Sequence, residues 1–550
     1  MLRPYQLVLK LLILKFWRAG VRNVLAVLPT GAGKTVLFSN IIKNNIGAAC
    51  VVAHRQELVC QISSALNKER VYHRIIGPRS VVKLAVAVHM AEENESYYRP
   101  DAPVAVAGVD TLIRRPDQLR AWARTVTLWV MDEAHHVLVN NKWGKAVAMF
   151  PNARGLGVTA TPERADGRGL GREYDGVMDK LVVGVSMREL IIAGFLSDYR
   201  VFAPPSDLDL TAVKISKATG EYNRDGVVRA IHKSHVVGDV VKHYLRIAPG
   251  KLGVTFASDV KTAHEIAAGY NAADVPAAVV HAGTPDADRV RLLREFRNRK
   301  ILQLVNVDLF GEGFDLPALE VCSMARPTQS YALYAQQFGR ALRIFESKGK
   351  AIIIDHVGNV ERHGLPDQAR VWSLRRRDRV SRANLNTIPV RACIECAGVY
   401  ERVLVTCPYC GAPFVPAERS RPDQVDGDLQ ELDADALAKL RGDVAKVDMP
   451  LAEYSALLRA RYVPHIGQRA HVKRHARRQD IQTTLRANID WWAGLQKAAG
   501  RGQQESYKRF YFQFGVDVLS AQALNERDAT ELAETIAGAV GYEYDRLVAA

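Results

Sequence analysis

The stretch Leu28-Pro-Thr-Gly-Ala-Gly-Lys-Thr35 constrains the fold of this chain more than any other. A compact apolar run, residues 24–28, leads into it and reads as a buried strand. Apolar residues at helical spacing follow it: Val36, Leu37, Ile41 and Ile42. A strand, a glycine loop and a helix in this order are the context that a phosphate-binding loop requires.

The residues of this loop match the chemistry of nucleotide binding. Thr30, Gly31 and Gly33 belong to a turn in which the glycines let backbone N–H groups face an anion, and the helix N-terminus adds positive charge. Lys34 is expected to reach the β- and γ-phosphates of ATP, and the Thr35 hydroxyl to ligate Mg²⁺. The general pattern begins with glycine where this chain has leucine, so a tight turn bearing a surface lysine is the alternative interpretation.

Length and charge limit the possible classes of protein. At 550 residues the chain exceeds one hydrophobic core, and 48% apolar residues indicate globular domains rather than disorder. A net charge of +16 predicts an anionic partner, with nucleic acid favoured over a membrane surface. The apolar stretch 7–17 is interrupted by lysines and predicts an amphipathic helix rather than a signal peptide. Scattered cysteines predict a reducing, cytoplasmic location.

Apolar runs in the first half alternate with helical or loop segments, which predicts a parallel sheet covered by helices. They lie at residues 48–53, 104–107, 126–131 and 155–160. Asp132 and Glu133 follow the third run, where one carboxylate is expected to hold Mg²⁺ and the other to activate water. An acidic surface turn is the alternative. The small polar turn 159–162 follows the fourth run.

A second set of apolar runs predicts a second α/β domain; these runs cover residues 252–257, 277–281, 301–306 and 351–355. Beyond the third run, a glycine turn carries a carboxylate at Asp315. Gln336, Arg340 and Arg343 are spaced to share one helix face. Cations aimed across a cleft neutralise charge in phosphoryl transfer, whereas a solvated basic helix is the alternative.

Two Cys-x-x-Cys pairs lie further along the chain, separated by ten residues. Cys393, Cys396, Cys407 and Cys410 supply four thiolates, which predicts a tetrahedral, structural Zn²⁺ site rather than redox pairs or free thiols. The segment 416–428 is expected to be a hinge.

The C-terminal region has helical periodicity and no catalytic constellation. Basic residues at 471–478, the pair Trp491–Trp492 and the mixed stretch 508–512 are compatible with nucleic-acid binding, although such aromatic residues are more often core.

Several motifs together resemble the superfamily 2 helicases in order and spacing. They are Arg3-Pro-Tyr-Gln6, residues 29–35, residues 53–58, Asp132 to His135, residues 159–162, residues 311–317 and residues 336–343. The chain resembles RadD-type bacterial and related phage-encoded repair helicases in the residues of the last two motifs, in the segment 355–359 and in the cysteine pairs.

This resemblance implies roles for individual residues. Gln6, with Arg3 beside it, would read adenine, and Gly313 and Asp315 would approach the nucleotide. Arg340 and Arg343 would serve as arginine fingers. The nucleic-acid backbone would be contacted by Arg55, Thr111 and His281, the last of which a buried histidine at a strand end explains equally well.

The expected architecture is α/β, with two tandem RecA-like domains at 1–195 and 236–370, a connector at 196–235, a zinc ribbon at 388–415 and a helical domain at 430–550. The expected function is an ATP-dependent DNA helicase or translocase in repair, recombination or replication, in a bacterial cell or phage-infected bacterium. An RNA helicase, a translocase subunit of a larger nucleic-acid-processing complex and a catalytically dead scaffold are the alternatives. Single-strand-binding or recombination proteins are the expected protein partners, with no membrane.

Overall fold

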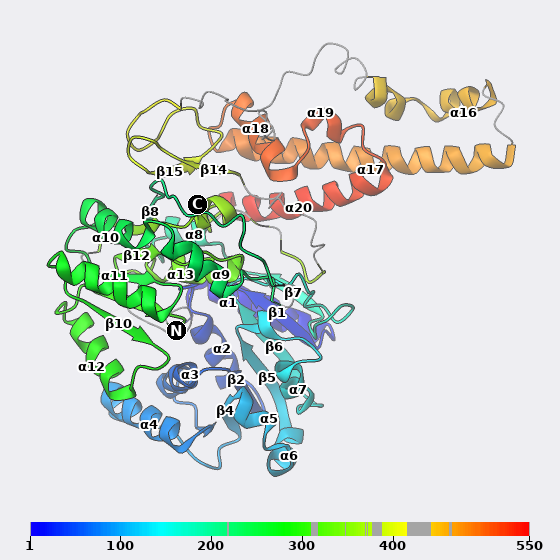
Figure 1. The fold of residues 1–550 in the computed structure, drawn as a ribbon. Coiled ribbons are helices and arrows are strands. Elements are labelled where there is room, and N and C mark those ends of the chain that lie inside the picture. The colour runs from blue at the N-terminus through cyan, green and yellow to red at the C-terminus, as the bar shows by residue number, and fades with distance from the viewer. Residues whose placement is uncertain are drawn as a thin grey trace. The chain divides into compact units, whose positions relative to one another are not determined.

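The computed structural model describes residues 2–216, 219–309, 317–346, 348–368, 370, 372–376, 388–414, 442–460 and 465–548. The chain divides into two compact units. The first holds residues 1–367, with 372–380 and 397–399, and the second holds 368–371, 381–396 and 400–550. The first unit contains two parallel sheets and the second contains the cysteine pairs and a helical domain (Figure 1).

The first lobe of unit 1 is built on a seven-stranded parallel sheet in the order β3-β4-β2-β5-β6-β1-β7. Its strands are β1 (Asn23–Val27), β2 (Ala48–Ala53), β3 (His73–Ile76), β4 (Val104–Gly108), β5 (Val126–Asp132), β6 (Arg154–Thr159) and β7 (Lys180–Val183). The central strands β1 and β2 are buried along their whole length, as expected for a sheet covered on both faces.

Helices connect and cover these strands. They are α1 (Pro4–Arg18), α2 (Lys34–Lys43), α3 (Gln56–Lys68), α4 (Arg79–Glu93), α5 (Val109–Ile113), α6 (Pro116–Thr125), the 3-10 turn η1 (Ala134–His136), α7 (Lys142–Ala148) and α8 (Met187–Ile192). Helix α1 confirms the amphipathic interpretation, because Leu9, Ile13 and Trp17 form its buried face and its lysines stay outside.

The second lobe has a six-stranded parallel sheet in the order β10-β11-β9-β12-β13-β8. Its strands are β8 (Tyr199–Phe202), β9 (Gly253–Phe256), β10 (Ala277–His281), β11 (Gln303–Val307), β12 (Val321–Met324) and β13 (Ala351–Asp355). Its helices are α9 (Arg224–His232), α10 (Val236–Ile247), α11 (Val260–Ala272), α12 (Asp286–Arg297), α13 (Tyr331–Arg340) and α14 (Asn359–His363). The tandem α/β architecture predicted from the sequence is confirmed.

The segment 196–235 is more than the connector expected from its polar composition. Strand β8 pairs with β13 at the edge of the second sheet. Val227 and Ile231 of α9 are buried in the core of the same lobe. The second lobe therefore begins near residue 199. The sequence did not indicate this boundary, because a four-residue edge strand and one short helix give only a weak periodic pattern of apolar residues.

Unit 2 contains a two-stranded ribbon and a helical domain. The ribbon strands are β14 (Val390–Ala392) and β15 (Val399–Glu401), and the helices are α16 (Leu451–Ala460), α17 (His465–Ala498), α18 (Gln503–Phe514), α19 (Val518–Ala521) and α20 (Glu526–Val548). Helices α17 and α20 run side by side (Figure 1), tied by the Asn488 side chain, which donates to the Ala533 carbonyl at 2.9 Å. The expected hinge at 416–428 lies outside the described residues. Among the described helices, none is long and apolar enough to cross a membrane.

Candidate active site and nucleic-acid interface

The phosphate-binding loop joins β1 to α2 with the geometry that its glycines permit. Gly31 and Gly33 have φ values of +87° and +79°, which side chains rarely adopt. A Cβ at Gly33 would lie 2.5 Å from Nε2 of Gln6, so glycine is needed for space as well. Lys34 begins α2, and its Nζ lies 3.5 Å from the Leu28 carbonyl oxygen, inside the loop.

Gln6 ties the N-terminal helix to this loop. Its Nε2 donates to the carbonyls of Ala32 and Gly33 at 3.0 and 3.1 Å, and its Oε1 accepts from the Arg3 N–H at 2.9 Å. The Arg3 guanidinium lies 4.8 Å from the centre of the Phe195 ring. Residues expected to contact adenine are therefore bonded directly to the loop expected to bind phosphate.

The two carboxylates stand at the carboxyl end of β5. Asp132 is 7% exposed, and its Oδ1 accepts from the Glu133 N–H at 3.0 Å. Glu133 has a left-handed backbone, with φ +50°, and is 8% exposed. A non-glycine residue in this conformation costs free energy that functional sites commonly tolerate. The acidic surface turn is therefore wrong for this motif, because both carboxylates are buried.

A chain of polar contacts links Glu133 to the next strand through His135. Nδ1 of His135 lies 3.5 Å from Oε2 of Glu133 and 3.1 Å from Oγ1 of Thr159. Since the Thr159 hydroxyl donates to the Thr161 carbonyl at 3.0 Å, it accepts from His135 Nδ1–H. Nη1 of Arg164 also donates to the His135 carbonyl at 3.0 Å. His135 thus connects Glu133 to the end of β6.

The second lobe presents α13 to the phosphate loop. A Cβ at Gly339 would lie 2.6 Å from Cβ of Thr30, and one at Gly31 would lie 4.0 Å from Cγ of Arg343. Arg340 is 7% exposed, and burial lowers the pKa of Arg343 to about 10. Arg343 therefore keeps its charge at neutral pH although it is half-buried. The solvated basic helix is wrong for this motif.

Helix α13 ends at Arg340, so the prediction that Arg343 shares its helix face is wrong, and Arg343 lies in the turn that follows. Hydrogen bonds fix the backbone of this turn. Nζ of Lys348 donates to the carbonyls of Ala341 and Arg343 at 2.5 and 2.7 Å. The Ser197 hydroxyl donates to the same Arg343 carbonyl at 3.2 Å. Burial lowers the pKa of Lys348 to about 8. Lys348 and Ser197 are positioning residues that the sequence does not single out.

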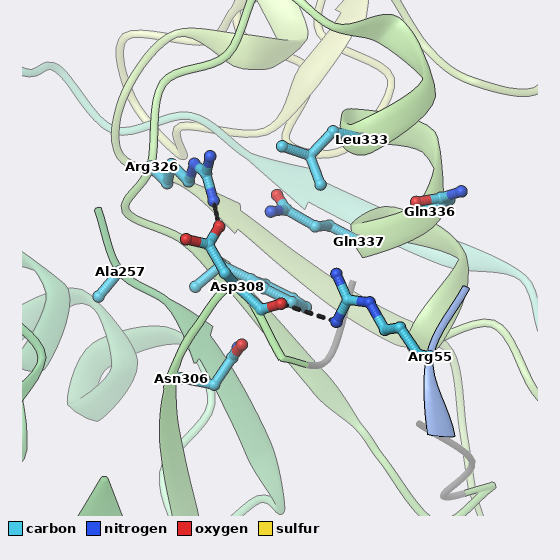
Figure 2. Close-up of a pocket in the computed structure, with 9 residues that line it drawn as sticks. Arg55, Ala257, Asn306, Asp308, Arg326, Leu333, Gln336 and Gln337 are labelled. Carbon is cyan, nitrogen blue, oxygen red and sulfur yellow. Dashed lines mark hydrogen bonds and ion pairs between the residues drawn. The ribbon is translucent and has the colours of Figure 1, made fainter. Parts of the chain in front are cut away.

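Arg55 crosses from the first lobe to the second. It precedes α3, and its Nη1 donates to the carbonyls of Asp308 and Leu309 at 2.9 and 3.2 Å. The Asp308 carboxylate pairs with Arg326, which follows β12, and lies 3.8 Å from Arg224. Figure 2 shows Arg55 and Arg326 approaching Asp308 from different sides.

A pocket opens beside this cluster at the carboxyl ends of the second sheet's strands. Nine residues line it: Arg55, Phe256, Ala257, Asn306, Asp308, Arg326, Leu333, Gln336 and Gln337 (Figure 2). Gln336 and Gln337 are 3% and 2% exposed, so their amides reach the pocket from a buried helix. Polar residues from both lobes therefore meet here.

Thr111 and His281 occupy other strand ends. Thr111 lies on α5, directly after β4, and is half-buried. His281 ends β10, its Nδ1 accepts from the Gly283 N–H at 3.1 Å and its own N–H donates to Thr284 Oγ1 at 3.0 Å. These bonds give His281 a local structural role, and its contact with nucleic acid stays a prediction.

Gly313 and Asp315 lie outside the described residues. The roles assigned to the individual site residues likewise stay predictions. The structure brings Gln6 and Arg343 together at the phosphate-binding loop. Arg55 separately meets the end of β11 at Asp308, whose carboxylate pairs with Arg326 after β12. The sequence offered one signal for this second cluster, a charged residue within two positions of the end of each of these strands.

The four cysteines of unit 2 form a cluster that can hold a tetrahedral metal ion. Their sulfur atoms lie within 4.8 Å of one another, with Sγ–Sγ distances of 3.6 Å for Cys393–Cys410 and 3.7 Å for Cys396–Cys407. Zinc–sulfur bonds of about 2.3 Å place the corners of a tetrahedron roughly 3.8 Å apart. The donor set thus fits Zn²⁺ and leaves no position for a catalytic water.

The other three cysteines differ from this cluster in the pKa of their thiols. Cys50, Cys60 and Cys322 are buried in the motor, and burial raises the pKa of each thiol, to about 11 for Cys60. In contrast, backbone N–H groups, that of Cys396 first, lower the pKa of Cys393 to about 7. Cys393 therefore has more thiolate character than the buried cysteines of the motor, as a metal ligand requires.

Two family descriptions match the motor. Residues 1–164 match "Type III restriction enzyme, res subunit", and residues 237–345 match "Helicase conserved C-terminal domain". The first segment contains Lys34, Asp132 and Glu133, and the second contains Arg340 and Arg343. The two segments together contain the charged residues that are predicted to bind and hydrolyse ATP.

Individual relatives agree with the family matches. A 51.5 kDa protein of Lactococcus phage (isolate 7-9) is 29% identical over 73% of this chain and 80% of its own length. "Putative ATP-dependent helicase IRC3" of Saccharomyces cerevisiae is 29% identical over 62% of this chain, which spans about half (49%) of that protein. "DNA 3'-5' translocase XPB2" of Sulfurisphaera tokodaii is 23% identical over 62% of this chain and 79% of that protein.

These matches identify an ATP-hydrolysing enzyme with a helicase motor. The matched segments coincide with the two parallel-sheet lobes and their facing charged residues. The narrower resemblance to RadD-type helicases stays a prediction. The chain belongs to the superfamily 2 helicases.

Proposed function

We propose that this chain is a DNA-stimulated ATPase that moves along or unwinds DNA in repair, recombination or replication. The observation that carries the proposal is the meeting of two lobes at the phosphate loop, where Arg343 of one lobe lies against Gly31 of the other. A nucleotide between them would contact both lobes, so its hydrolysis would change how tightly they hold each other.

In this mechanism the loop N–H groups and Lys34 bind the ATP phosphates, while Gln6 and Arg3 receive the adenine. Glu133 orients a water molecule and accepts its proton as the water attacks the γ-phosphate. Arg340 and Arg343 neutralise the charge that develops on the transferred group. Thr35 and Asp132 would hold Mg²⁺, which screens phosphate charge when bound.

The chain through His135 and Thr159 links hydrolysis to the rest of the first lobe. Arg55 contacts the second lobe through the carbonyls after β11. Arg55 is therefore placed to exchange a carbonyl partner for a phosphate of the nucleic-acid backbone. Backbone contacts carry no sequence information, so binding is expected to be largely sequence-independent and to weaken with salt.

DNA is favoured over RNA as the substrate. One relative carries the name of a DNA translocase, and the cysteine pairs and motif wording resemble RadD-type repair helicases. Zn²⁺ held by the four cysteines would serve folding, and a reducing cytoplasm would suit the seven cysteines. Single-strand-binding or recombination proteins are the partners that such a role implies.

The test is ATP hydrolysis by the full chain with single-stranded DNA, duplex DNA, forked DNA and RNA added separately. Stimulation by DNA is expected, and Lys34→Ala should abolish it. A strand-displacement assay on the forked substrate then separates unwinding from translocation alone.

Two outcomes would overturn the proposal. Stimulation by RNA alone would make the chain an RNA helicase. An absence of hydrolysis with every nucleic acid would indicate a catalytically dead binding protein or a motor subunit that needs a larger complex.

A further inference from the structure

The first half of α17 carries an unusual concentration of positive charge. Between residues 465 and 478 the sequence contains no Asp or Glu, and its cations are Arg469, Lys473, Arg474, Arg477 and Arg478. The structure divides them into two groups according to what their side chains contact.

Two of the cations are used within the domain. Arg478 donates through Nε to the Leu524 carbonyl at 2.8 Å, and Nε of Arg477 pairs with Glu526 at 3.1 Å. Arg469, Lys473 and Arg474 are exposed and, within the part of the chain that the structure describes, have no ion-pair partner. These three cations serve no purpose in the packing of the domain.

The opposite side of α17 is covered. The His475 ring stacks on Tyr454 of α16 with 4.0 Å between ring centres, and its Nε2 donates to the Met449 carbonyl at 2.9 Å. Nε2 of Gln479 donates to the Val447 and Met449 carbonyls, both at 2.9 Å. Packing therefore turns the unpaired cations toward solvent.

An exposed aromatic side chain continues the same face. Trp491 is 51% exposed, whereas its neighbour Trp492 is 2% exposed and belongs to the core. At about 100° per residue, Arg469, Lys473 and Trp491 fall within an arc of roughly 40° around the helix. Lys473 and Trp491 are about 27 Å apart along the axis.

We propose that this face of α17, formed by Arg469, Lys473 and Trp491 with Arg474 about 100° around the helix from Lys473, is a second DNA-binding surface that takes single-stranded DNA. The cations bind backbone phosphates and the indole of Trp491 stacks on a base, which is the usual combination for binding a single strand. A duplex keeps its bases stacked inside and offers Trp491 no ring face.

The composition of the face argues against a membrane as its partner. Between Lys473 and Trp491 the solvent side carries Asp480, Thr484 and Ala487, so no broad apolar stripe is present there. The proposal rests on the proposed function for the identity of its ligand, DNA, and adds a site outside the motor.

The test measures binding of a labelled oligothymidylate to the full chain, without nucleotide, over a series of salt concentrations. Each phosphate contact with a single strand contributes about 0.7 to the slope of log affinity against log salt. Arg469→Gln with Lys473→Gln should lower that slope by about 1.4. Lys497→Gln with Arg527→Gln removes the same charge from exposed positions elsewhere in the unit and should leave the slope unchanged.

A second arm tests stacking. Trp491→Ala should weaken binding about tenfold, and Tyr507→Ala, which removes another side chain that is 51% exposed, should not. An oligonucleotide of abasic sites should bind the native chain more weakly than oligothymidylate does, and this difference should shrink in Trp491→Ala. DNA-independent ATP hydrolysis should be the same in every variant.

Equal salt slopes for the two double variants would overturn the proposal, as would equal affinities for Trp491→Ala and Tyr507→Ala. Performing the binding in a Lys34→Ala background keeps the two proposals separate. If DNA fails to stimulate hydrolysis but α17-dependent binding persists, the proposed motor function fails and this inference stands. If DNA stimulates hydrolysis and the α17 substitutions do not change DNA binding, only the inference fails.

Discussion

The cations of the motor and those of α17 are the same residue types in opposite settings. Arg340 is buried and Arg343 is half-buried, and Lys348 holds the Arg343 backbone in place. Arg469 and Lys473 are exposed on one helix. Buried, fixed cations act on charge that develops during a reaction, whereas exposed ones act on the standing charge of a polyanion.

The same contrast holds for how the two units are stabilised. Each lobe of the motor has a sheet buried between helices, but the ribbon of unit 2 has a small core formed by Cys393, Tyr400 and Cys407. A core of this size cannot stabilise a fold by itself, so bound metal would have to contribute. Four experiments would break or sharpen this comparison.

Metal removal should have the largest effect, and only on unit 2. Structural Zn²⁺ contributes about 10–16 kcal/mol of binding free energy in small domains, so a chelator or Cys407→Ser should unfold the ribbon. Proteolysis followed by mass spectrometry should show cleavage within 388–414, with DNA-independent ATP hydrolysis retained. Cys60→Ser, at a thiol buried in the first lobe, is the control, and equal cleavage in this variant would contradict the assignment.

Removing an arginine finger should have the next largest effect. Arg343→Ala is expected to lower kcat for ATP hydrolysis about 10³–10⁵-fold, because no other group replaces its charge at the phosphate loop. Arg246→Ala removes an exposed arginine of the same lobe and should leave kcat unchanged. A loss of less than tenfold in Arg343→Ala would show that this side chain does not contact the transferred phosphate.

Lys348→Met should reproduce part of that loss without touching the nucleotide. The substitution removes the Lys348 donor from the Ala341 carbonyl and leaves the Arg343 carbonyl with Ser197 alone, and a misplacement of about 1 Å can cost roughly 10²-fold in rate. We expect kcat to fall by up to that factor with KM for ATP nearly constant, and Lys348→Arg to restore part of it. A change confined to KM would rule out positioning of Arg343.

Acid should destabilise the first lobe by a smaller amount. Burial lowers the pKa of His73 to about 4, and its Nε2 lies 2.7 Å from Ser63 Oγ and its Nδ1 2.8 Å from the Val71 carbonyl oxygen. The native ring stays neutral while the unfolded one takes a proton below about pH 6.5. The stabilisation is therefore complete above pH 6.5 and is lost as pH falls toward 4, by about 2 kcal/mol at pH 5.

Thermal unfolding of the native chain and of His73→Gln between pH 7 and pH 5 measures this contribution. His73→Gln should show a shallower decrease of Tm with acid. His264→Gln removes an exposed histidine of the second lobe and should not change the slope. Identical slopes for all three proteins would contradict the assignment to His73.

Interior strands were predictable, whereas β10 is the one described edge strand of the two sheets that matches a predicted apolar run. The apolar runs at 48–53 and 351–355 coincide with the interior strands β2 and β13, because a strand buried on both faces must be apolar throughout. Strands such as β3 and β7 lie at sheet edges, where half-exposed positions accept polar residues. Their sequences carry no continuous apolar signal.

The aromatic residues of the C-terminal region show a second limit of prediction from the sequence. The stretch 508–512 looks like cations interleaved with aromatic rings, but Arg509 is 8% exposed and pairs with Glu401, and Phe510 is fully buried. Only Trp491, of the pair Trp491–Trp492, faces solvent. Residue type alone could not separate the core ring from the exposed one.

The sequence by itself determined the local chemistry of this protein: a glycine loop before a helix, two carboxylates after a strand and two cysteine pairs. These motifs depend on residues that are neighbours in the chain, so their spacing can be recognised in the sequence. Only the tertiary structure placed Arg343 at Gly31, Lys348 beneath Arg343 and the unpaired cations of α17 on an open face. Those relations join residues distant in sequence or depend on burial, which packing between elements decides.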